Sequence, residues 1–362
     1  MRGEFDSRYP LQELFTTTSA IVSSMKTHKV TILPGDGIGP EIVEASIDVL
    51  EATGVAFDWE RIELNADIMQ AAKVTIPQET LEAIKKSRVA IKGPISTPVG
   101  GGFVSPNVLL RQQLGLYASI RPAKSIAGIA IMKKSLNVIV VRENTEDVYV
   151  GIENETEPGK VVAQKIITRS ASERIARCAF ELAQVQKRKK VTALHKADIL
   201  KLSDGLFLDS CRAVAKLYPG IDYDEAIVDS ACMQLVLEPE RFDVIVAPNM
   251  YGDIVSDITA GLIGGLGLAG SMNQGDGVTV YEAVHGSAPD IAGKGIANPS
   301  GLLMACVMML RNLDEEAAAV SLEHALLSTL AEGKHLTPDL GGNTTTDEFK
   351  AAVIAKLPKS LQ

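Results

Sequence analysis

Short apolar runs alternate with amphipathic segments from residue 29 onward. The apolar run VTIL at 30–33 precedes EIVEASIDVLEAT at 41–53, whose apolar positions recur at the spacing of a helix. The alternation continues through VAFDWERIE, ETLEAIKKS and VAIKGP, which ends at residue 94. Strands that alternate with helices in this way are typical of βαβ units. The pattern therefore predicts an α/β protein with a parallel sheet that is covered by helices on both faces.

The second half of the chain continues this pattern with one exception. Strands are expected at NVIVVREN and KVTALH, a long helix at ASERIARCAFELAQVQKRK, and a buried strand followed by a helix in residues 243–265. Residues 151–170 alternate like strands but have charged flanks, which predicts an exposed β-arm, with a long surface loop as the alternative. Two segments rich in proline and glycine, 93–102 and 286–299, are candidate ligand loops.

Composition and charge limit the class of protein. With 362 residues, of which 46% are hydrophobic, the chain can form one large α/β domain or two domains. The net charge of −9 argues against nucleic acid and anionic membranes as partners, and no apolar run is long enough to span a bilayer. The four cysteines lie far apart without a CxxC pair, as is typical of reduced core residues. We expect a cytoplasmic protein or, alternatively, one of the mitochondrial matrix.

The first 24 residues do not share the α/β pattern. They contain Glu4, Asp6 and Glu13, whereas secretory signals need an apolar core and mitochondrial leaders avoid acidic residues. We expect residues 1–24 to be a disordered leader or an expression scar, with Met25 as the natural beginning.

Three arginines lie in apolar or uncharged surroundings, where a solvated arginine is not expected. Arg111, Arg121 and Arg142 each carry a guanidinium group that can bind a planar carboxylate through two hydrogen bonds. Ser105 and Asn107 precede Arg111 at a predicted helix start and add polar donors. Together these residues predict a site for a substrate with several carboxylates. The alternative is three unrelated structural ion pairs.

Two aspartates at the start of another predicted helix indicate a cation site. Asp253 and Asp257 are four residues apart, so both carboxylates face the same way. Because like charges repel, a bound cation is a reason to place them together, and oxygen ligands suit Mg²⁺ or Mn²⁺. Asp229 follows a predicted strand and can supply a third ligand. The alternative is a pair of solvated aspartates.

A lysine and a tyrosine are candidates for proton transfer. Lys196 follows an apolar strand, and Tyr149 comes seven residues after Arg142. Arginines and a metal near Lys196 would lower its pKa and suit it to carry a proton. The alternative is a surface lysine and a core tyrosine.

The segment at 281–299 is dense in small residues and predicts a loop that closely surrounds a flat ligand. His285 and Asn298 bracket it, and Asp290 can accept hydrogen bonds from a ribose diol. An acidic residue there would repel a 2′-phosphate and so select NAD over NADP. A plain surface loop is the alternative. The earlier glycine-rich stretch LPGDGIGPEI, residues 33–42, runs G-x-G-x-G and does not fit the dinucleotide fingerprint.

Seven motifs in this order resemble those of the β-decarboxylating dehydrogenases, the family of the isocitrate, 3-isopropylmalate, homoisocitrate and tartrate dehydrogenases. The match runs from about Lys29 to Phe349 through LPGDGIGPEI, KGPISTPVGGG, LLRQQLGLYASIRP, VVRENTEDVYVGIE, HKADIL, APNMYGDIVSD and HGSAPDIAGKGIANP. The segment FVSPNVLLR is most similar to the NAD-dependent isocitrate enzymes, which carry serine and asparagine at the positions of Ser105 and Asn107. Isopropylmalate enzymes instead place a leucine-rich surface there.

The resemblance implies an isocitrate/isopropylmalate dehydrogenase-like α/β fold, not the Rossmann fold. It implies two α/β domains and an exposed β-arm for dimerisation. The large domain, on the cofactor side, would comprise residues 25–120 and 265–362. The small domain, on the metal side and at the dimer interface, would comprise residues 121–264, with the arm at 151–170.

The resemblance also implies a role for each candidate residue. The three arginines match the substrate's carboxylate clamp, and Ser105 with Asn107 matches the contacts to the third carboxylate. An acidic and an aliphatic residue at the positions of Asp290 and Ile291 accompany NAD in the family, whereas NADP enzymes have lysine and tyrosine. The remaining matches are the catalytic pair Tyr149 and Lys196, the metal ligands Asp229, Asp253 and Asp257, and the cofactor contacts Ile38, Ser96, Thr97, His285, Gly286, Ser287, Ala288, Asp290, Ile291 and Asn298.

The implied reaction is NAD-dependent oxidative decarboxylation of isocitrate to 2-oxoglutarate and CO₂, with Mg²⁺ or Mn²⁺. In the family, Lys196 and Asp229 would reach into the neighbouring subunit's site, which implies a homodimer or a higher homo-oligomer with shared active sites. Asp198 stands beside the lysine where many relatives have asparagine. The alternatives are homoisocitrate or 3-isopropylmalate as the substrate, or a non-catalytic regulatory subunit. Regulatory subunits typically lose the tyrosine, the lysine or the metal carboxylates, and all of these are present.

Overall fold

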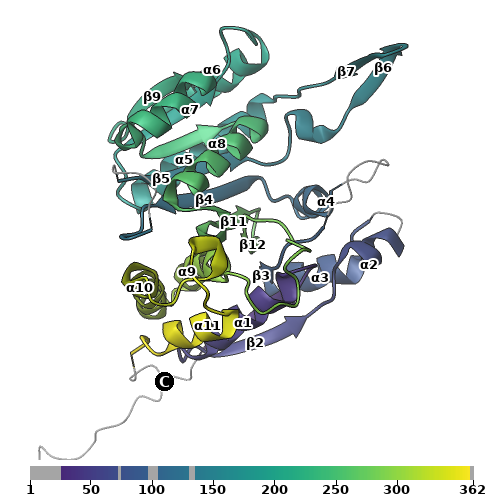
Figure 1. The fold of residues 1–362 in the computed structure, drawn as a ribbon. Helices are drawn as coiled ribbons and strands as arrows, with labels where there is room; N and C mark the ends of the chain where they lie inside the picture. Colours follow the sequence, from purple (N-terminus) through teal and green to yellow (C-terminus); the bar gives the residue numbers. More distant parts are fainter. Residues whose placement is uncertain (1–25, 72–74, 97–104, 130–134, 359–362) are drawn as a thin grey trace, which may run out of the picture.

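The computed structural model describes residues 26–71, 75–96, 105–129 and 135–358. Within these ranges, ten strands form one sheet and two form a separate hairpin (Figure 1). In chain order the strands are β1 (His28–Leu33), β2 (Phe57–Arg61), β3 (Val89–Lys92), β4 (Ala118–Lys124), β5 (Asn137–Glu143), β6 (Glu153–Glu157), β7 (Lys160–Ala163), β8 (Lys190–His195), β9 (Asp222–Ile227), β10 (Val244–Ala247), β11 (Gly270–Gln274) and β12 (Thr279–Ala283).

The helices cover the sheet and begin at local signals in the sequence. Pro40 lies in the first turn of α1, and the Thr168 side chain accepts a hydrogen bond from Ala171 N at the start of α5. The described helices are α1 (Gly39–Glu51), α2 (Ala66–Ala71), α3 (Gln78–Ser87), α4 (Pro106–Gln113), α5 (Arg169–Val185), α6 (Ser203–Ala215), α7 (Val228–Leu237), α8 (Asn249–Ile263), α9 (Ser300–Asn312), α10 (Glu316–Glu332) and α11 (Thr346–Ile354), with the short 3₁₀ helices η1 (Val148–Val150), η2 (Pro239–Arg241), η3 (Leu266–Leu268) and η4 (Pro338–Leu340). Among these helices, none is both long and apolar enough to cross a membrane.

The sheet runs in the order β2-β1-β3-β12-β11-β4-β5-β10-β8-β9. Its two ends are parallel, as the βαβ pattern predicts. The prediction of a wholly parallel sheet is wrong at the centre, where β12, β11, β4 and β5 pair antiparallel. One physical reason is connection length: β11 and β12 are joined by residues 275–278, a turn too short for a crossover.

The strand order is compatible with the expected domains. The strands β2, β1, β3, β12 and β11 come from residues 25–120 and 265–362, and β5, β10, β8 and β9 come from 121–264. Strand β4 spans the boundary, so a single sheet continues from one side to the other. The division into two domains stays a prediction.

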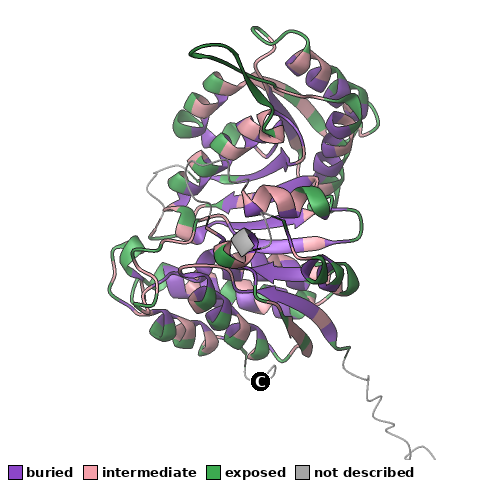
Figure 2. Ribbon diagram, turned by 90° about the vertical axis from the view of Figure 1, so that its right-hand side faces the viewer, coloured by how far each residue is buried: buried purple, intermediate pink, exposed green. Residues whose placement is uncertain are grey.

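The hairpin β6–β7 is the expected β-arm. Its strands pair antiparallel, and every residue in both is exposed (Figure 2). The arm extends away from the other elements (Figure 1). Exposed apolar side chains on and beside it include Ile152, Val161 and Val162. An arm of this kind has no core of its own, and burial against a partner would stabilise it.

A buried ion pair crosses two central strands of the sheet. Lys92 on β3 lies opposite Glu282 on β12, with 2.6 Å between Nζ and Oε2. Asn273 on β11 donates to Glu282 Oε1 at 2.7 Å. Burial alone would raise the pKa of Glu282, but the charges of Lys92 and Arg111 outweigh it and lower the pKa to about 2. The carboxylate therefore stays ionised inside the sheet.

We expect Glu282→Gln to lower the free energy of unfolding at pH 7 by about 3–5 kcal/mol, because Lys92 would be left as an unpaired buried charge. The Glu282 pKa is lower in the folded than in the unfolded chain, so its contribution is complete above about pH 4.3 and is lost as the pH falls towards 2. Urea unfolding at neutral and acidic pH measures this. The difference in the free energy of unfolding between the wild type and the variant should become smaller in acid.

Asp48→Asn is the matched control, because it removes a carboxylate from a more exposed ion pair, 2.7 Å from Lys350 Nζ. It should cost less than about 1 kcal/mol. Equal costs for the two variants would contradict the prediction.

Candidate active site

Three arginine side chains converge where α4, β4 and β5 meet α8. Arg142, at the end of β5, is 1% exposed and donates from Nε and Nη2 to Asn249 Oδ1 at 2.9 and 2.7 Å. Arg121, on β4, donates to Ser256 Oγ at 2.7 Å. Arg111, on α4, lies 3.3 Å from Glu282. The three arginines come from consecutive elements of the chain, and the fold brings α8 to them from 111 and 132 residues further along.

Asp253 on α8 is the carboxylate that Arg121 and Arg142 both contact. It accepts a hydrogen bond from Arg142 Nη1 and lies 3.3 Å from Arg121 Nη1. Gly252 allows this approach, because a Cβ there would lie 2.6 Å from Arg142 Cγ. Burial would raise the pKa of Asp253, but the charges of Arg142 and Arg121 lower it overall.

The carboxylates at the cluster do not balance this much buried positive charge. Burial, followed by the charges of Arg121 and Arg111, lowers the pKa of Arg142 to about 9. Burial and the charge of Arg111 likewise lower the pKa of Arg121. Each shift means that burial, together with repulsion between the guanidinium groups, outweighs the attraction of the nearby carboxylates. The cluster is therefore arranged to accept further negative charge.

Tyr149 lies at the edge of the same cluster. Its hydroxyl donates to Asp253 Oδ2, and the Arg142 guanidinium carbon lies 5.0 Å from its ring centroid. Burial and the bond to Asp253 raise the pKa of Tyr149, so the phenol keeps its proton at neutral pH.

Three other candidate residues, Asp257, Ser105 and Asn107, lie on or at the start of the helices α8 and α4, where the sequence predicted helices. Asp257 lies one turn after Asp253 on α8, 3.8 Å from Arg121, and burial raises its pKa. Ser105 is the N-cap residue of α4. The Oδ1 atom of Asn107 is buried and has no hydrogen-bond partner among the described residues. A buried polar atom left open in this way suits a ligand site.

Lys196 and Asp229 form a second cluster. Lys196 Nζ lies 2.7 Å from Asp229 Oδ1 and 3.4 Å from Asp198 Oδ2. The expectation of a lowered Lys196 pKa supposed arginines and a metal nearby; within one chain the hydrogen bond to Asp229 raises the pKa instead, and the charge of Asp198 adds to the effect. No group of three or more His, Cys, Asp or Glu side chains within the described ranges is placed to hold a metal ion.

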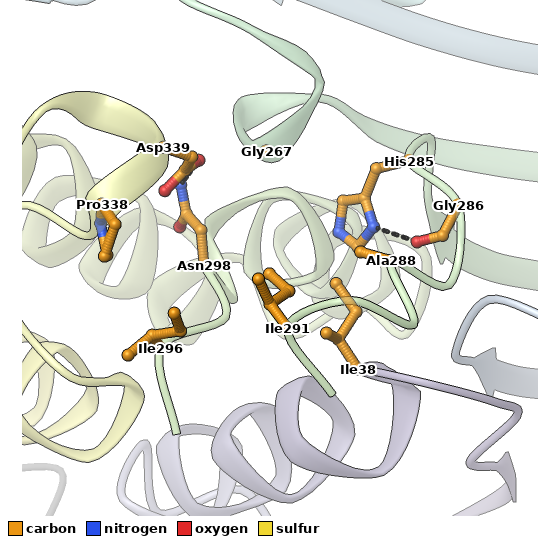
Figure 3. A pocket seen from close by; sticks show the side chains of 10 residues that line it. All are labelled: Ile38, Gly267, His285, Gly286, Ala288, Ile291, Ile296, Asn298, Pro338 and Asp339. Atoms are coloured by element: carbon orange, nitrogen blue, oxygen red, sulfur yellow. Dashed lines mark hydrogen bonds between the residues drawn. The ribbon is translucent and has the colours of Figure 1, made fainter. Parts of the chain in front are cut away.

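A cavity of about 600 Å³ lies beside the 285–298 loop (Figure 3). Six of the expected cofactor contacts line it: Ile38, His285, Gly286, Ala288, Ile291 and Asn298. Gly267, Ile296, Pro338 and Asp339 also line it and were not predicted. Asp339 comes from η4 near the C-terminus and accepts a hydrogen bond from Asn298 Nδ2 at 2.9 Å. Nothing in the local sequence around Asp339 indicates this contact, because only the fold brings η4 to the loop.

His285 has an open hydrogen-bonding atom in this cavity. Its Nδ1 lies 3.0 Å from the carbonyl oxygen of Gly286, which assigns the proton to Nδ1. Burial lowers the pKa of His285, so the ring is neutral at pH 7. The Nε2 atom is buried and has no partner among the described residues, which leaves it as an acceptor.

The first glycine-rich loop forms the edge of this cavity. Ile38 N donates to Ser287 O at 2.9 Å, and Ser96 Oγ donates to Ser287 Oγ at 2.8 Å. Asp36, which the sequence alone did not indicate, accepts a hydrogen bond from Ser96 N at 2.8 Å. These contacts place LPGDGIGPEI, which contains the implied cofactor contact Ile38, beside the cavity. Asp290 is exposed and is not among the lining residues, and Thr97 lies outside the described residues.

Residues 29–353 match the family described as Isocitrate/isopropylmalate dehydrogenase. The chain therefore belongs to the isocitrate/isopropylmalate dehydrogenases, an oxidoreductase family, as the seven motifs predicted. The expected fold class is confirmed as well.

Individual relatives are similar over almost the whole chain. A mitochondrial NAD isocitrate dehydrogenase regulatory subunit of Dictyostelium discoideum is 49% identical over 98% of this chain and 99% of its own length. The mitochondrial NAD isocitrate dehydrogenase catalytic subunit 5 of Arabidopsis thaliana is 48% identical over 92% of this chain and 90% of its own. The crystal structure of isocitrate dehydrogenase from Methylococcus capsulatus, at 46% identity, matches with a TM-score of 0.87 over 91% of this chain and 99% of that chain.

We expect Gly37→Ala to destabilise the loop at the cavity edge. Gly37 has φ +59°, and a Cβ there would lie 1.9 Å from the carbonyl oxygen of Ser287. Gly115→Ala is the matched control, because Gly115 has φ +62° but no atom within 4 Å of its Cβ position. Gly115→Ala should lower the free energy of unfolding by about 1–2 kcal/mol. Gly37→Ala should lower it by about 1–3 kcal/mol more. Urea unfolding measures both, and a similar cost for the two would show that the Ser287 contact adds nothing.

Proposed function

We propose that this chain is a catalytic NAD-dependent isocitrate dehydrogenase that converts isocitrate to 2-oxoglutarate and CO₂ with Mg²⁺ or Mn²⁺. The observation that carries the proposal is the buried cluster of Arg111, Arg121 and Arg142, in which Arg121 and Arg142 contact Asp253 and Arg111 contacts Glu282. Isocitrate has three carboxylates, and planar guanidinium groups bind such groups through paired hydrogen bonds. Ser105 and Asn107, at the start of α4, add the polar contacts that an isopropyl group would not use.

The acidic residues fit a hard divalent cation. Asp253 and Asp257 lie one turn apart on α8 and offer carboxylate oxygens, which Mg²⁺ and Mn²⁺ prefer. In the proposed dimer, Asp229 of the partner subunit would complete the ligand set. When bound, the cation would polarise the substrate's C2 oxygen and stabilise negative charge after loss of CO₂.

The proton-carrying residues are Tyr149 and Lys196. Tyr149 holds its proton at Oη and is the proposed donor to C3 of the substrate. Lys196, acting in the neighbouring subunit's site, is the proposed acceptor for the proton of the C2 hydroxyl. In this chain Asp229 and Asp198 hold Lys196 protonated, so this pairing must be released before Nζ can take a proton.

The cavity beside the 285–298 loop supports NAD as the hydride acceptor. Its lining is mainly apolar, and the free Nε2 of His285 can accept a hydrogen bond from an adenine amino group. Asp290 and Ile291 follow in the same loop, where an acidic residue disfavours a 2′-phosphate. Ser96, with Thr97, would lie towards the nicotinamide.

Catalysis rather than regulation is favoured by the complete set of reactive groups. The relatives include both regulatory and catalytic subunits with nearly the same identity, so similarity alone does not separate the two roles. Tyr149, Lys196 and the three aspartates are all present, and a purely regulatory chain would not require them.

We also propose a homodimer or higher homo-oligomer that joins through the arm at 151–170 and shares its active sites. The exposed apolar residues of the arm support this assembly. The two relatives described above are mitochondrial, which supports the matrix rather than the cytoplasm as the location. The two-domain division, with the cofactor on the larger side, belongs to the same proposal.

The purified chain alone should oxidise isocitrate with NAD and require Mn²⁺ or Mg²⁺. Initial rates should be at least about tenfold higher with NAD than with NADP, because Asp290 repels a 2′-phosphate. The same assay with homoisocitrate and 3-isopropylmalate compares the alternative substrates. Faster turnover of 3-isopropylmalate would contradict the role of Ser105 and Asn107, and metal-independent turnover would contradict the aspartate ligands. A chain that binds isocitrate but shows no turnover alone would be a regulatory subunit.

Mixed dimers test the shared site. Tyr149→Phe and Lys196→Met should each reduce kcat by at least about 100-fold, because each removes a proton carrier. Unfolding the two variants together and refolding them should restore up to about half of the wild-type activity in mixed dimers. This follows because a mixed dimer has one site with both groups intact. No recovery on mixing would contradict shared sites, and refolded wild type is the control for yield.

A further inference from the structure

One buried lysine has no role in the site described so far. Lys165 follows the arm, in the stretch between β7 and α5, and its side chain is 13% exposed. Its Nζ lies 3.0 Å from Asp204 Oδ1 and 3.7 Å from Asp147 Oδ1, and both aspartate side chains are fully buried. It also lies 4.2 Å from the centre of the Tyr251 ring. We name Lys165, Asp147 and Asp204 the Lys165 clamp.

The Asp147 half of the clamp holds the segment that carries Tyr149. Asp147 Oδ1 accepts a hydrogen bond from Val148 N at 2.8 Å, at the start of η1, and Oδ2 accepts one from Met250 N at 3.0 Å. Its backbone N donates to the carbonyl oxygen of Ile166 at 2.8 Å. Asp147 has φ +75° and ψ −153°, a conformation that is rare for any residue except glycine. The surrounding contacts therefore keep a strained residue in place two positions before Tyr149.

The Asp204 half of the clamp holds the segment that carries Lys196. Asp204, in the first turn of α6, accepts a hydrogen bond from Lys196 N through Oδ2 at 2.6 Å. The other oxygen, Oδ1, faces Lys165. Asp147 thus accepts backbone N–H bonds on both oxygens and Asp204 on one, and both aspartates face the same ammonium group.

We propose that Lys165 is a positioning residue that fixes the Tyr149 and Lys196 segments relative to each other through Asp147 and Asp204. The inference rests on the proposed function, in which Tyr149 serves its own chain's site and Lys196 serves the partner's. One clamp then orients a proton carrier in each of the two sites of a dimer. Without the ammonium charge, two buried carboxylates would repel each other and loosen both segments.

The test places Lys165→Met in one chain of the mixed dimer at a time. In a dimer of a Tyr149→Phe chain with a Lys196→Met chain, the intact site takes Lys196 from the first chain and Tyr149 from the second. Lys165→Met in the first chain tests the Lys196 half of the clamp, and in the second chain it tests the Tyr149 half. Each placement should lower kcat by about 10- to 100-fold, because small misplacement of a reacting group is costly. The KM for isocitrate should change by less than about threefold, because the three arginines are untouched.

The outcomes separate positioning from simple stability. An unchanged kcat per folded mixed dimer in either placement would overturn the proposal, even if Lys165→Met lowered the melting temperature. Activity per dimer is therefore normalised to folded dimer, measured by size-exclusion chromatography. If the parent mixture regains no activity, the shared site of the proposed function is wrong, and the assignment of the two halves to different sites is wrong with it.

Asp204→Asn covers the case in which Lys165→Met does not fold, because it keeps Lys165 paired with Asp147. Asp204→Asn should lower the kcat of the mixed dimer only when it is placed in the chain that supplies Lys196. An equal loss of kcat with either placement would overturn the proposal. Lys350→Met is the matched control. Lys350 also lies between two aspartates, 2.7 Å from Asp48 and 2.8 Å from Asp347, but on α11, away from both segments. It should leave kcat unchanged in either chain.

Discussion

Buried positive charge around Asp253 is the constraint on which the site depends. Arg142 is almost completely enclosed, and a guanidinium group in that position needs an anion or several hydrogen-bond acceptors. Asn249 and Asp253 supply them from the first turns of α8, and Gly252 lets the arginine lie against the helix backbone. The start of α8 is therefore fixed against β5 by charge as well as by packing, and Tyr149 is held to the same carboxylate.

A second set of buried charges lies at the centre of the sheet and contacts the arginine cluster. Lys92 and Glu282 pair across β3 and β12, and Glu282 also faces Arg111 on α4. Asn273 links Glu282 to Asn144, which follows β5. The antiparallel strands at the centre thus join the cofactor side of the sheet to the arginine cluster through buried polar contacts, although Asn144 Oδ1 has no partner among the described residues. Buried networks of this kind specify one arrangement, because a partly satisfied network costs free energy.

Most of the sequence-based prediction rests on local periodicity and on motifs. The helices at 41–53 and 79–87, the arm at 151–170 and the strand that leads into α8 all occur where the pattern placed them. The antiparallel centre was missed because Arg121 and Pro122 interrupt the apolar pattern of β4, and strand direction follows from connection length rather than from periodicity. The raised pKa of Lys196 was missed because it depends on Asp229.

The sequence by itself determined the elements, the family and the residue types at the site, because these depend on local spacing and on the order of motifs. Only the tertiary structure decided which side chains meet. Arg121 and Arg142 meet Asp253, which lies 132 and 111 residues further along the chain, because the fold packs distant segments together, here α8 against β4 and β5. Asp339 reaches the cofactor cavity, and Lys165 lies between two buried carboxylates, for the same reason. Charge interactions depend on distance and burial in space, and neither quantity can be read from separation along the chain.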